Sequence, residues 1–148
     1  MPFTNRELFA KLIACEAGGE GEDGMKAVAT TIINRVNISY GEFASVSQGG
    51  NLRNIMFQPN QYTCMKETTA GQYNAQNVYN IDPQQIHYDI ADWAIAGNKL
   101  NGVDHSLFYF NPFIPTCIFA FPPSGTGRFH NRVHQHCFYV PTMQYRRT

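Results

Sequence analysis

The chain has 148 residues, a length that predicts a single domain over residues 1–148 with a hydrophobic core of its own. Charged residues make up only 15% of the chain, against a typical value of about 25%, while aromatic residues make up 14%. The formal net charge is zero, which argues against a disordered chain and gives no electrostatic reason to expect nucleic acid as a partner. A surface rich in amides and aromatic rings suits neutral polar ligands such as sugars.

The first predicted helix starts behind Thr4, which caps it, and Glu7 completes a capping box. Apolar residues then recur at spacings of three and four, and Gly18 and Gly19 end the helix. Glu16 falls on this apolar stripe, so its side chain is expected to face inward. That placement is unusual for a carboxylate.

A second helix is predicted from about Gly24 to Val36, with an apolar face along its length. Residues 37–54 are rich in Gly, Ser and Asn and are predicted to form a loop with a short turn at Ser39–Phe43. Residues 55–64 are mixed, and Pro59 argues against a simple strand there.

A third helix is predicted from Asp82, with Asp82 as the cap, Pro83 in the first helical position, Gln85 closing the capping box and Gly97 ending it. The weakly patterned residues 67–79 are predicted to form a further helix. From Asp104 to Pro141 aromatic residues and prolines dominate, which favours short strands and turns. Together these elements predict an α+β fold that is mainly α.

The ends of the chain give no targeting signal. The opening residues lack a basic leader followed by an apolar run and a cleavage site, so no secretory signal peptide is expected. No run of 18 apolar residues occurs, so no transmembrane segment is predicted.

The four cysteines are Cys15, Cys64, Cys117 and Cys137. They form no C-x-x-C pair, which argues against a zinc ribbon or a thioredoxin-like site. Free, partly buried thiols are the favoured interpretation. A disulfide between Cys117 and Cys137 is the alternative in an oxidising compartment.

Glu16 is the main candidate for chemistry, because an inward carboxyl group is desolvated and its pKa rises. A glutamic acid that stays protonated near neutral pH can protonate a leaving oxygen, which is what glycoside cleavage requires. Glu20 lies four residues further on, but Gly18 and Gly19 interrupt the helix between them. The spacing is therefore weak support for a pair of carboxylates, and a mechanism with one carboxylate stays open.

The sequence gives less support to two other kinds of chemistry, a metal site and a nucleophilic cysteine. His130, His134 and His136, with Cys137 or Cys117, have spacings that suit a metal ion, yet the chain has no H-E-x-x-H motif. One structural histidine and two surface histidines are the favoured interpretation. A nucleophilic Cys15 is disfavoured, because Cys15 does not lie at a helix N-terminus, where its pKa would be lowered.

Tyrosines next to amides are candidates for a sugar-binding groove. Tyr62 follows Gln61, and Tyr109 lies two residues before Asn111. Aromatic faces and amide groups bind sugar rings by stacking and paired hydrogen bonds.

The segment LFAKLIACEAGGEGEDGMKAVATTIINRV resembles the opening of the SleB/CwlJ family of spore-cortex-lytic cell-wall hydrolases. The residues that carry this resemblance are Glu16, Ala17, Gly19, Glu20, Gly24, Met25, Asn34 and Arg35. The segments IMFQPNQYTC, LFYFNP and HCFYVP are similar to three further family segments and follow in the family's order. The resemblance runs from about Glu7 to Thr142. The HCFYVPT ending and the spacing from Pro112 to Cys117 place the chain nearer to the CwlJ branch.

The resemblance implies a lysozyme-like, mainly α catalytic domain that cleaves the glycan strands of spore-cortex peptidoglycan during germination. It assigns the general acid to Glu16. In related lytic transglycosylases one glutamate protonates the glycosidic oxygen and then acts as base while the sugar's 6-hydroxyl attacks, which leaves a 1,6-anhydro end. A muramidase-type or glucosaminidase-type hydrolysis is the alternative product chemistry.

Further site residues are predicted as well. Glu20 is a second catalytic candidate, which would orient water or substrate. The expected groove residues are Gln61, Tyr62, Tyr109, Asn111 and His136. No cofactor or metal ion is expected. Gly18 departs from the family pattern and loosens the end of the helix, so the family pattern fixes the position of Glu20 less closely.

The resemblance also implies partners and a location. The partners are peptidoglycan glycan strands and, at the spore surface, a coat protein. The chain is expected to be made in the cytoplasm and deposited at the spore coat or cortex. Two rival functions stay open: a catalytically silent protein that binds peptidoglycan or the spore coat, and a metal-dependent amidase that uses the three C-terminal histidines.

Overall fold

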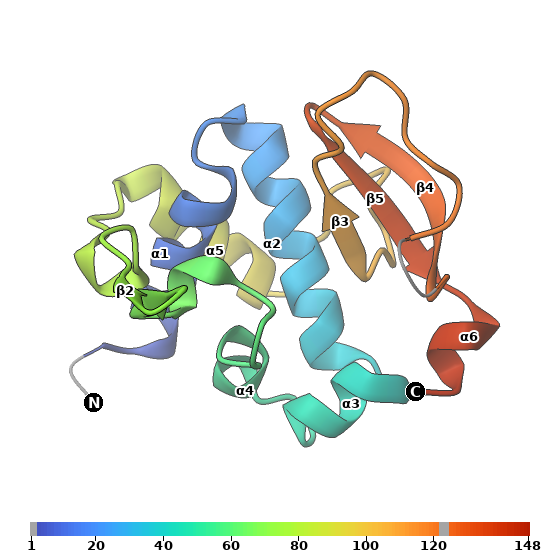
Figure 1. Cartoon of the computed structure of the whole chain (residues 1–148), viewed down its shortest axis with the longest axis horizontal. Coiled ribbons are helices and arrows are strands. Elements are labelled where there is room, and N and C mark those ends of the chain that lie inside the picture. The colour runs from blue at the N-terminus through green and yellow to red at the C-terminus, as the bar shows by residue number, and fades with distance from the viewer. Residues whose placement is uncertain (1–2, 122–124) are drawn as a thin grey trace.

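The computed structural model describes residues 3–121 and 125–148, and Figure 1 shows its elements in sequence order. The helices are α1 (Asn5–Ala17), α2 (Gly21–Asn37), α3 (Gly41–Ser47), α4 (Leu52–Met56), η1 (Thr63–Met65), η2 (Val78–Asn80), α5 (Gln85–Ile95) and α6 (Met143–Arg146). The strands are β1 (Thr68–Thr69), β2 (Gln72–Tyr73), β3 (Phe108–Phe110), β4 (Gly127–Val133) and β5 (His136–Pro141). The fold is α+β and mainly helical, as predicted.

The first two helices form largely as predicted. Thr4 and Glu7 make the predicted capping box, in which the Glu7 backbone N–H donates to Thr4 Oγ1 at 3.1 Å and the Thr4 N–H donates to Glu7 Oε1 at 2.9 Å. Helix α2 starts at Gly21, three residues before the predicted start. Glu22 and Asp23 therefore lie in its first turn, where negative charge interacts favourably with the helix dipole.

The loop predicted over residues 37–54 is wrong in part, because α3 and α4 lie there. Phe43 on α3 is 2% exposed, and Ile55 on α4 is fully buried. Asn51 caps α4 by accepting a hydrogen bond from the Asn54 N–H at 3.0 Å. Burial of a few apolar anchors outweighs the loop-like composition, since tertiary packing routinely overrides weak local propensity.

Two further local predictions are wrong. Residues 67–79 do not form the predicted helix; they form the β1–β2 hairpin, whose turn places Ala70 and Gly71 at positive φ, and the start of the short 3-10 helix η2. The predicted cap at Asp82 is also displaced, because α5 starts at Gln85 and Gln84 is its N-cap. The Gln84 N–H donates to Nδ1 of His87, which takes the place predicted for Gln85 in the capping box.

The predicted strands of the last third form an antiparallel sheet in the order β3–β5–β4. Tyr109 pairs with Phe138, and Phe110 pairs with Cys137. A disulfide joins Cys137 to Cys117 in the segment between β3 and β4, so the alternative to four free thiols is the correct one for this pair. Residues 122–124, which belong to the predicted strand region, lie outside the described residues.

Helix α2 is the centre of the molecule. In Figure 1 it lies between α1 and α5 on one side and the β3–β5–β4 sheet on the other. Its buried residues run along almost its whole length, from Gly24 to Val36 with the exception of Lys26. One helix therefore positions both the end of α1 and the strand β3, which carry the residues discussed below.

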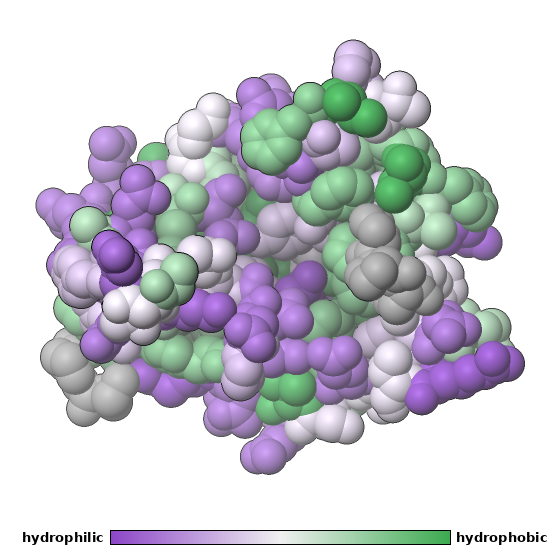
Figure 2. Space-filling view, in the orientation of Figure 1, coloured by the Kyte–Doolittle hydropathy of each residue, from purple (hydrophilic) through white to green (hydrophobic). Residues whose placement is uncertain are grey.

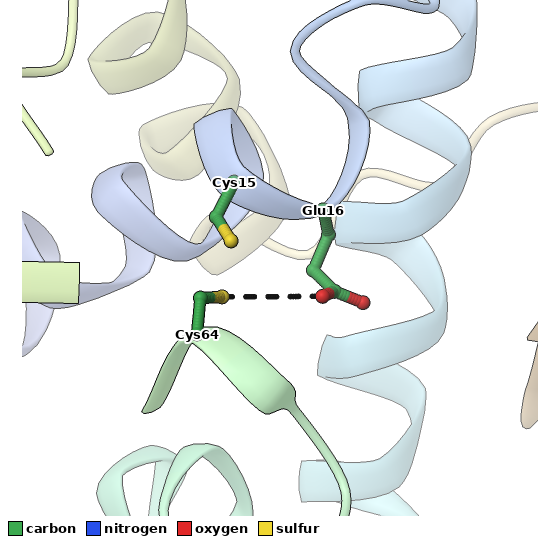
Figure 3. Close-up of side chains that lie close together, drawn as sticks. All are labelled: Cys15, Glu16 and Cys64. Atoms are coloured by element: carbon green, nitrogen blue, oxygen red, sulfur yellow. Dashed lines mark hydrogen bonds between the residues drawn. The ribbon is translucent and has the colours of Figure 1, made fainter. Parts of the chain in front are cut away.

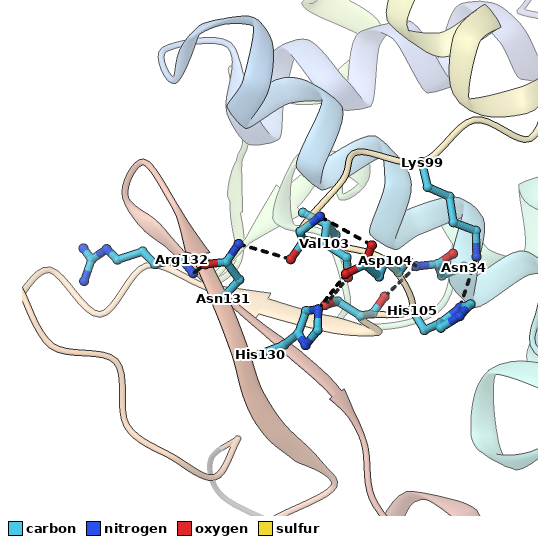
Figure 4. Close-up of polar contacts among 10 residues, drawn as sticks. Asn34, Lys99, Val103, Asp104, His105, His130, Asn131 and Arg132 are labelled. Carbon is cyan, nitrogen blue, oxygen red and sulfur yellow. Dashed lines mark hydrogen bonds and ion pairs between the residues drawn. The ribbon is translucent and has the colours of Figure 1, made fainter.

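A polar cluster joins α2 to the sheet (Figure 4). Asn34 Nδ2 donates to the backbone carbonyls of Asp104 at 2.7 Å and Ser106 at 2.9 Å. His130 on β4 pairs with the Asp104 carboxylate at 2.9 Å, and this contact lowers the pKa of Asp104. These contacts fix the segment that leads into β3.

The surface over the sheet is partly apolar. Figure 2 shows exposed apolar side chains on that side of the molecule. The exposed ones in the segment between β3 and β4 are Phe113, Ile114, Ile118 and Phe119. Among the described residues, no helix has both the length and the apolar character needed to cross a membrane.

Candidate active site

Glu16 lies in the last turn of α1 and is partly buried, as its helical phase predicted. The Tyr109 hydroxyl on β3 donates a hydrogen bond to Glu16 Oε1 at 2.5 Å. On the other side, the Cys64 thiol points to Oε2 at a distance of 3.9 Å (Figure 3). The carboxyl group is therefore held from both sides, by a strand and by the helix η1.

Burial raises the pKa of Glu16 above the usual glutamate value. The hydrogen bond from Tyr109 and the charges of His136 and Arg35 act in the opposite direction but do not cancel the effect of burial. Burial, together with the Glu16 charge, also raises the pKa of Tyr109 well above its usual value, so its hydroxyl keeps its proton and stays a donor. The arrangement favours a protonated Glu16 in a fixed orientation.

Arg35 of α2 is a buried cation behind the site. Its Nε donates to the Leu107 carbonyl at 2.7 Å, and its Nη1 donates to the Tyr62 hydroxyl at 2.9 Å and to Gln61 Oε1 at 3.1 Å. Its guanidinium lies 4.6 Å from the centre of the Phe43 ring. Gln61 and Tyr62 thus both contact Arg35. Tyr62 is only 3% exposed, so it offers little surface to a ligand.

Glu20 and His136 form an ion pair at the other end of the site. Glu20 also accepts a hydrogen bond from the Gln135 N–H at 3.1 Å. The His136 ring meets the Tyr109 ring edge to face, with 5.3 Å between centroids. The side chains therefore follow one another in the order Glu16, Tyr109, His136, Glu20.

Asn111 follows β3 and joins this row through Gln135. Its Nδ2 donates to Gln135 Oε1 at 3.1 Å, and its Oδ1 accepts from the Phe113 N–H at 2.8 Å. Asn111 and Gln135 line an open pocket together with Phe113, Ile114, Pro115 and Arg132. An amide beside apolar side chains is suited to contacts with a sugar ring.

The three C-terminal histidines do not gather around one point, so the hypothesis of a histidine metal site is wrong. His130 contacts Asp104, and His136 contacts Glu20, while His134 is exposed in the β4–β5 turn at positive φ. Within residues 3–121 and 125–148, three metal-ligating side chains come together only at Cys15, Glu16 and Cys64. Cys15 therefore lies beside a thiol and a carboxyl group. This cluster of described residues contains no histidine that could activate Cys15 as a nucleophile.

Arg35 and Cys64 were not predicted as site residues. An arginine on a largely apolar helix face is a signal that could have pointed to Arg35, since a buried cation needs partners. No signal in the sequence pointed to Cys64, which reaches Glu16 from η1. The neighbouring Cys15 thiol and burial raise the pKa of Cys64, so its sulfur is a neutral donor to Glu16.

The arrangement defines a class of protein: a helical enzyme with one buried acid held at the end of a helix. The family described as Cell Wall Hydrolase matches residues 19–139, and the chain belongs to this family of enzymes. The predicted resemblance to SleB/CwlJ proteins is confirmed.

Relatives with a similar sequence are also named cell wall hydrolases. The cell wall hydrolase CwlJ of Oceanobacillus iheyensis is 31% identical over 138 residues, which cover 92% of this chain and 86% of that protein. CwlJ of Halalkalibacterium halodurans is 27% identical, and the match covers 92% of this chain and 85% of that protein.

Two solved structures share the fold. The catalytic domain of the germination-specific lytic transglycosylase SleB of Bacillus anthracis has a TM-score of 0.63 at 22% identity, with 93% of this chain and 97% of that chain covered. The catalytic domain of the Bacillus cereus SleB protein has a TM-score of 0.63 at 24% identity, with 91% and 88% covered. The predicted fold, that of a lysozyme-like catalytic domain, is confirmed.

Proposed function

We propose that this cell wall hydrolase cleaves the glycan strands of peptidoglycan and that Glu16 is its general acid. The observation that supports this most is the Glu16 carboxyl group itself, whose pKa is raised by burial and whose orientation is fixed by Tyr109. An acid of this kind can protonate the glycosidic oxygen as the bond breaks.

The mechanism needs one carboxylate. The charged groups that act most strongly on the pKa of Glu16 are His136 and Arg35, both bases. Glu20 is engaged by His136 and by the Gln135 N–H, so its oxygens serve structure rather than proton transfer. After the bond breaks, the Glu16 carboxylate takes a proton from the attacking hydroxyl. Attack by the sugar's own 6-hydroxyl gives an anhydro end, the product class that goes with the lytic transglycosylase name of the Bacillus anthracis SleB structure.

The other predicted residues take supporting roles. Tyr109 orients Glu16, Glu20 positions His136, and His136 packs against Tyr109. Gln61 and Tyr62 hold the guanidinium of Arg35, whose charge favours the ionised form of Glu16 that follows proton donation. Asn111 lines the pocket in which a neighbouring sugar would lie. The spore cortex as target and a coat protein as partner follow from the family resemblance alone.

The test is mass spectrometry of fragments released from purified cortex peptidoglycan by the wild type, Glu16→Gln and Glu22→Gln. Glu22 is an exposed glutamate at the start of α2, paired with Lys26, and makes a matched control. We expect Glu16→Gln to lose about 100-fold or more of the activity, since positioned general acids contribute 10²–10⁴-fold. Glu22→Gln should behave as the wild type.

The products separate the mechanisms. Anhydro-muramic ends that vanish with Glu16→Gln support the transglycosylase, and reducing ends that vanish support hydrolysis by the same acid. Full activity of Glu16→Gln would overturn the assignment of Glu16. Binding to peptidoglycan without release of fragments would favour the catalytically silent binding protein.

A further inference from the structure

Two free thiols face the Glu16 carboxyl group. Cys15 and Glu16 are consecutive residues at the end of α1, and Cys64 approaches from η1, as Figure 3 shows. The two sulfur atoms and a Glu16 oxygen all lie within 4.8 Å of one another. The proposed mechanism uses the carboxyl group and assigns no chemical step to either thiol.

The geometry of this cluster is close to that of a tetrahedral metal site. Zinc binds thiolate sulfur at about 2.3 Å and carboxylate oxygen at about 2.0 Å, so ligand atoms in a tetrahedral site lie roughly 3.5–3.8 Å apart. The distance from Cys64 Sγ to Glu16 Oε2 is 3.9 Å. Movements of about 1 Å or less would therefore complete the three-ligand set, with a fourth position left for water.

The cluster is reachable from the surface. A cavity of about 80 Å³ opens onto Cys15, Glu16 and Cys64 and is also lined by Thr63, Asn74 and Gln76. This is room for an ion with a water molecule, and the lining is polar enough to hold that water. Calcium and magnesium prefer all-oxygen sites, whereas two thiolates select a thiophilic cation.

We propose that Cys15, Cys64 and Glu16 form a binding site for a thiophilic divalent cation of the zinc type. On binding, the two thiols and the carboxyl group release their protons to solvent and coordinate the ion. The bound ion coordinates the Glu16 oxygen that would otherwise carry the catalytic proton. Metal binding therefore inhibits the enzyme. This inhibitory consequence rests on the proposed role of Glu16, while the binding site itself does not.

Binding is tested on the full, tag-free chain with the metal alone, first Zn²⁺ and then Co²⁺. Without metal, a thiol reagent should modify Cys15 and Cys64; one equivalent of Zn²⁺ should protect both. Co²⁺ should give the charge-transfer band of thiolate ligation. Cys15→Ser and Cys64→Ser should each lose the protection and the band, while His130→Gln, which alters the surface pair with Asp104, should keep both.

Activity is a separate measurement. Zn²⁺ should stop fragment release by the wild type, a chelator should restore it, and whatever activity Cys15→Ser shows without metal should not fall when Zn²⁺ is added. If Glu16→Gln proves fully active while Zn²⁺ still protects the thiols, the site stands and the catalytic assignment fails. Three results would overturn the site: equal thiol reactivity with and without Zn²⁺, a Co²⁺ spectrum without thiolate ligation, or a Cys15–Cys64 disulfide that forms despite Zn²⁺.

Discussion

At the scale of single residues, Tyr109 makes the most direct contact with Glu16, the proposed general acid. Its hydroxyl bonds to Glu16 Oε1 at 2.5 Å, and this bond lowers the pKa of Glu16 against the effect of burial. In Tyr109→Phe we therefore expect the pKa of Glu16 to rise further. The alkaline limb of the pH–rate profile should move to higher pH, and the rate should fall several-fold because the carboxyl group is less well oriented.

The pH profile of fragment release measures this shift. Tyr139→Phe is a suitable control, because it removes a hydroxyl that donates to the Ile118 carbonyl rather than to Glu16. A profile for Tyr109→Phe that coincides with the wild type would show that this bond does not set the proton affinity of the acid.

Protonation of Glu16 should also make the free energy of unfolding depend on pH. Its pKa is higher in the folded chain than in the unfolded chain, so between these two values the folded state holds more protons. The free energy of unfolding of the wild type should therefore fall as pH rises from the usual glutamate value through the raised one. Glu16→Gln should lack this decrease and be the more stable form above that window.

Urea denaturation over a pH series tests this, with Glu22→Gln as a control whose carboxylate is exposed. The difference in unfolding free energy between Glu16→Gln and the wild type should be smallest at acidic pH and largest above the raised pKa. A difference independent of pH would mean that Glu16 is not desolvated.

How much of the site could be predicted depends on how local its contacts are. The inward placement of Glu16 follows from helical phase within one segment, and the structure confirms it. The contacts of Glu20 with His136 and of Glu16 with Cys64 join segments far apart in the chain. No periodicity reports such contacts, so Cys64 and the pairing of Glu20 could not be read from the sequence.

At the scale of elements, the same distinction explains the local errors. The capping box of α1 depends on two residues three apart and was predicted correctly. Helices α3 and α4 depend on the burial of Phe43 and Ile55 against distant parts of the core. Residues 67–79 have weak helical patterning, but positive φ at Ala70 and Gly71 makes the turn of a hairpin.

The contact between α2 and the segment before β3 yields a prediction on stability. Asn34 is 6% exposed and donates to the carbonyls of Asp104 and Ser106. Asn34→Ala leaves both carbonyls without this donor, so we expect a loss of about 1–3 kcal/mol in the free energy of unfolding. Chemical denaturation measures it, and Asn37→Ala, which alters an exposed asparagine at the end of the same helix, should change stability by less than about 0.5 kcal/mol.

At the scale of the whole molecule, the Cys117–Cys137 disulfide ties the segment after β3 to the central strand β5. It spans 20 residues of sequence, and a loop of that size constrains the unfolded chain by about 3 kcal/mol in the chain-entropy description. The same bond anchors the segment that contains Asn111 and the exposed apolar residues Phe113 and Ile114. Its loss should thus affect both folding and the wall of the pocket beside Asn111.

We therefore expect the double variant Cys117→Ser/Cys137→Ser to lose up to about 3 kcal/mol in the free energy of unfolding. The Michaelis constant for cortex fragments should rise more than the turnover falls, because Glu16 and Tyr109 are held by α1 and β3 rather than by the disulfide. Chemical denaturation and steady-state kinetics measure the two effects. A large loss of turnover at an unchanged Michaelis constant would instead show that the disulfide acts on the acid itself, through the pairing of β3 with β5.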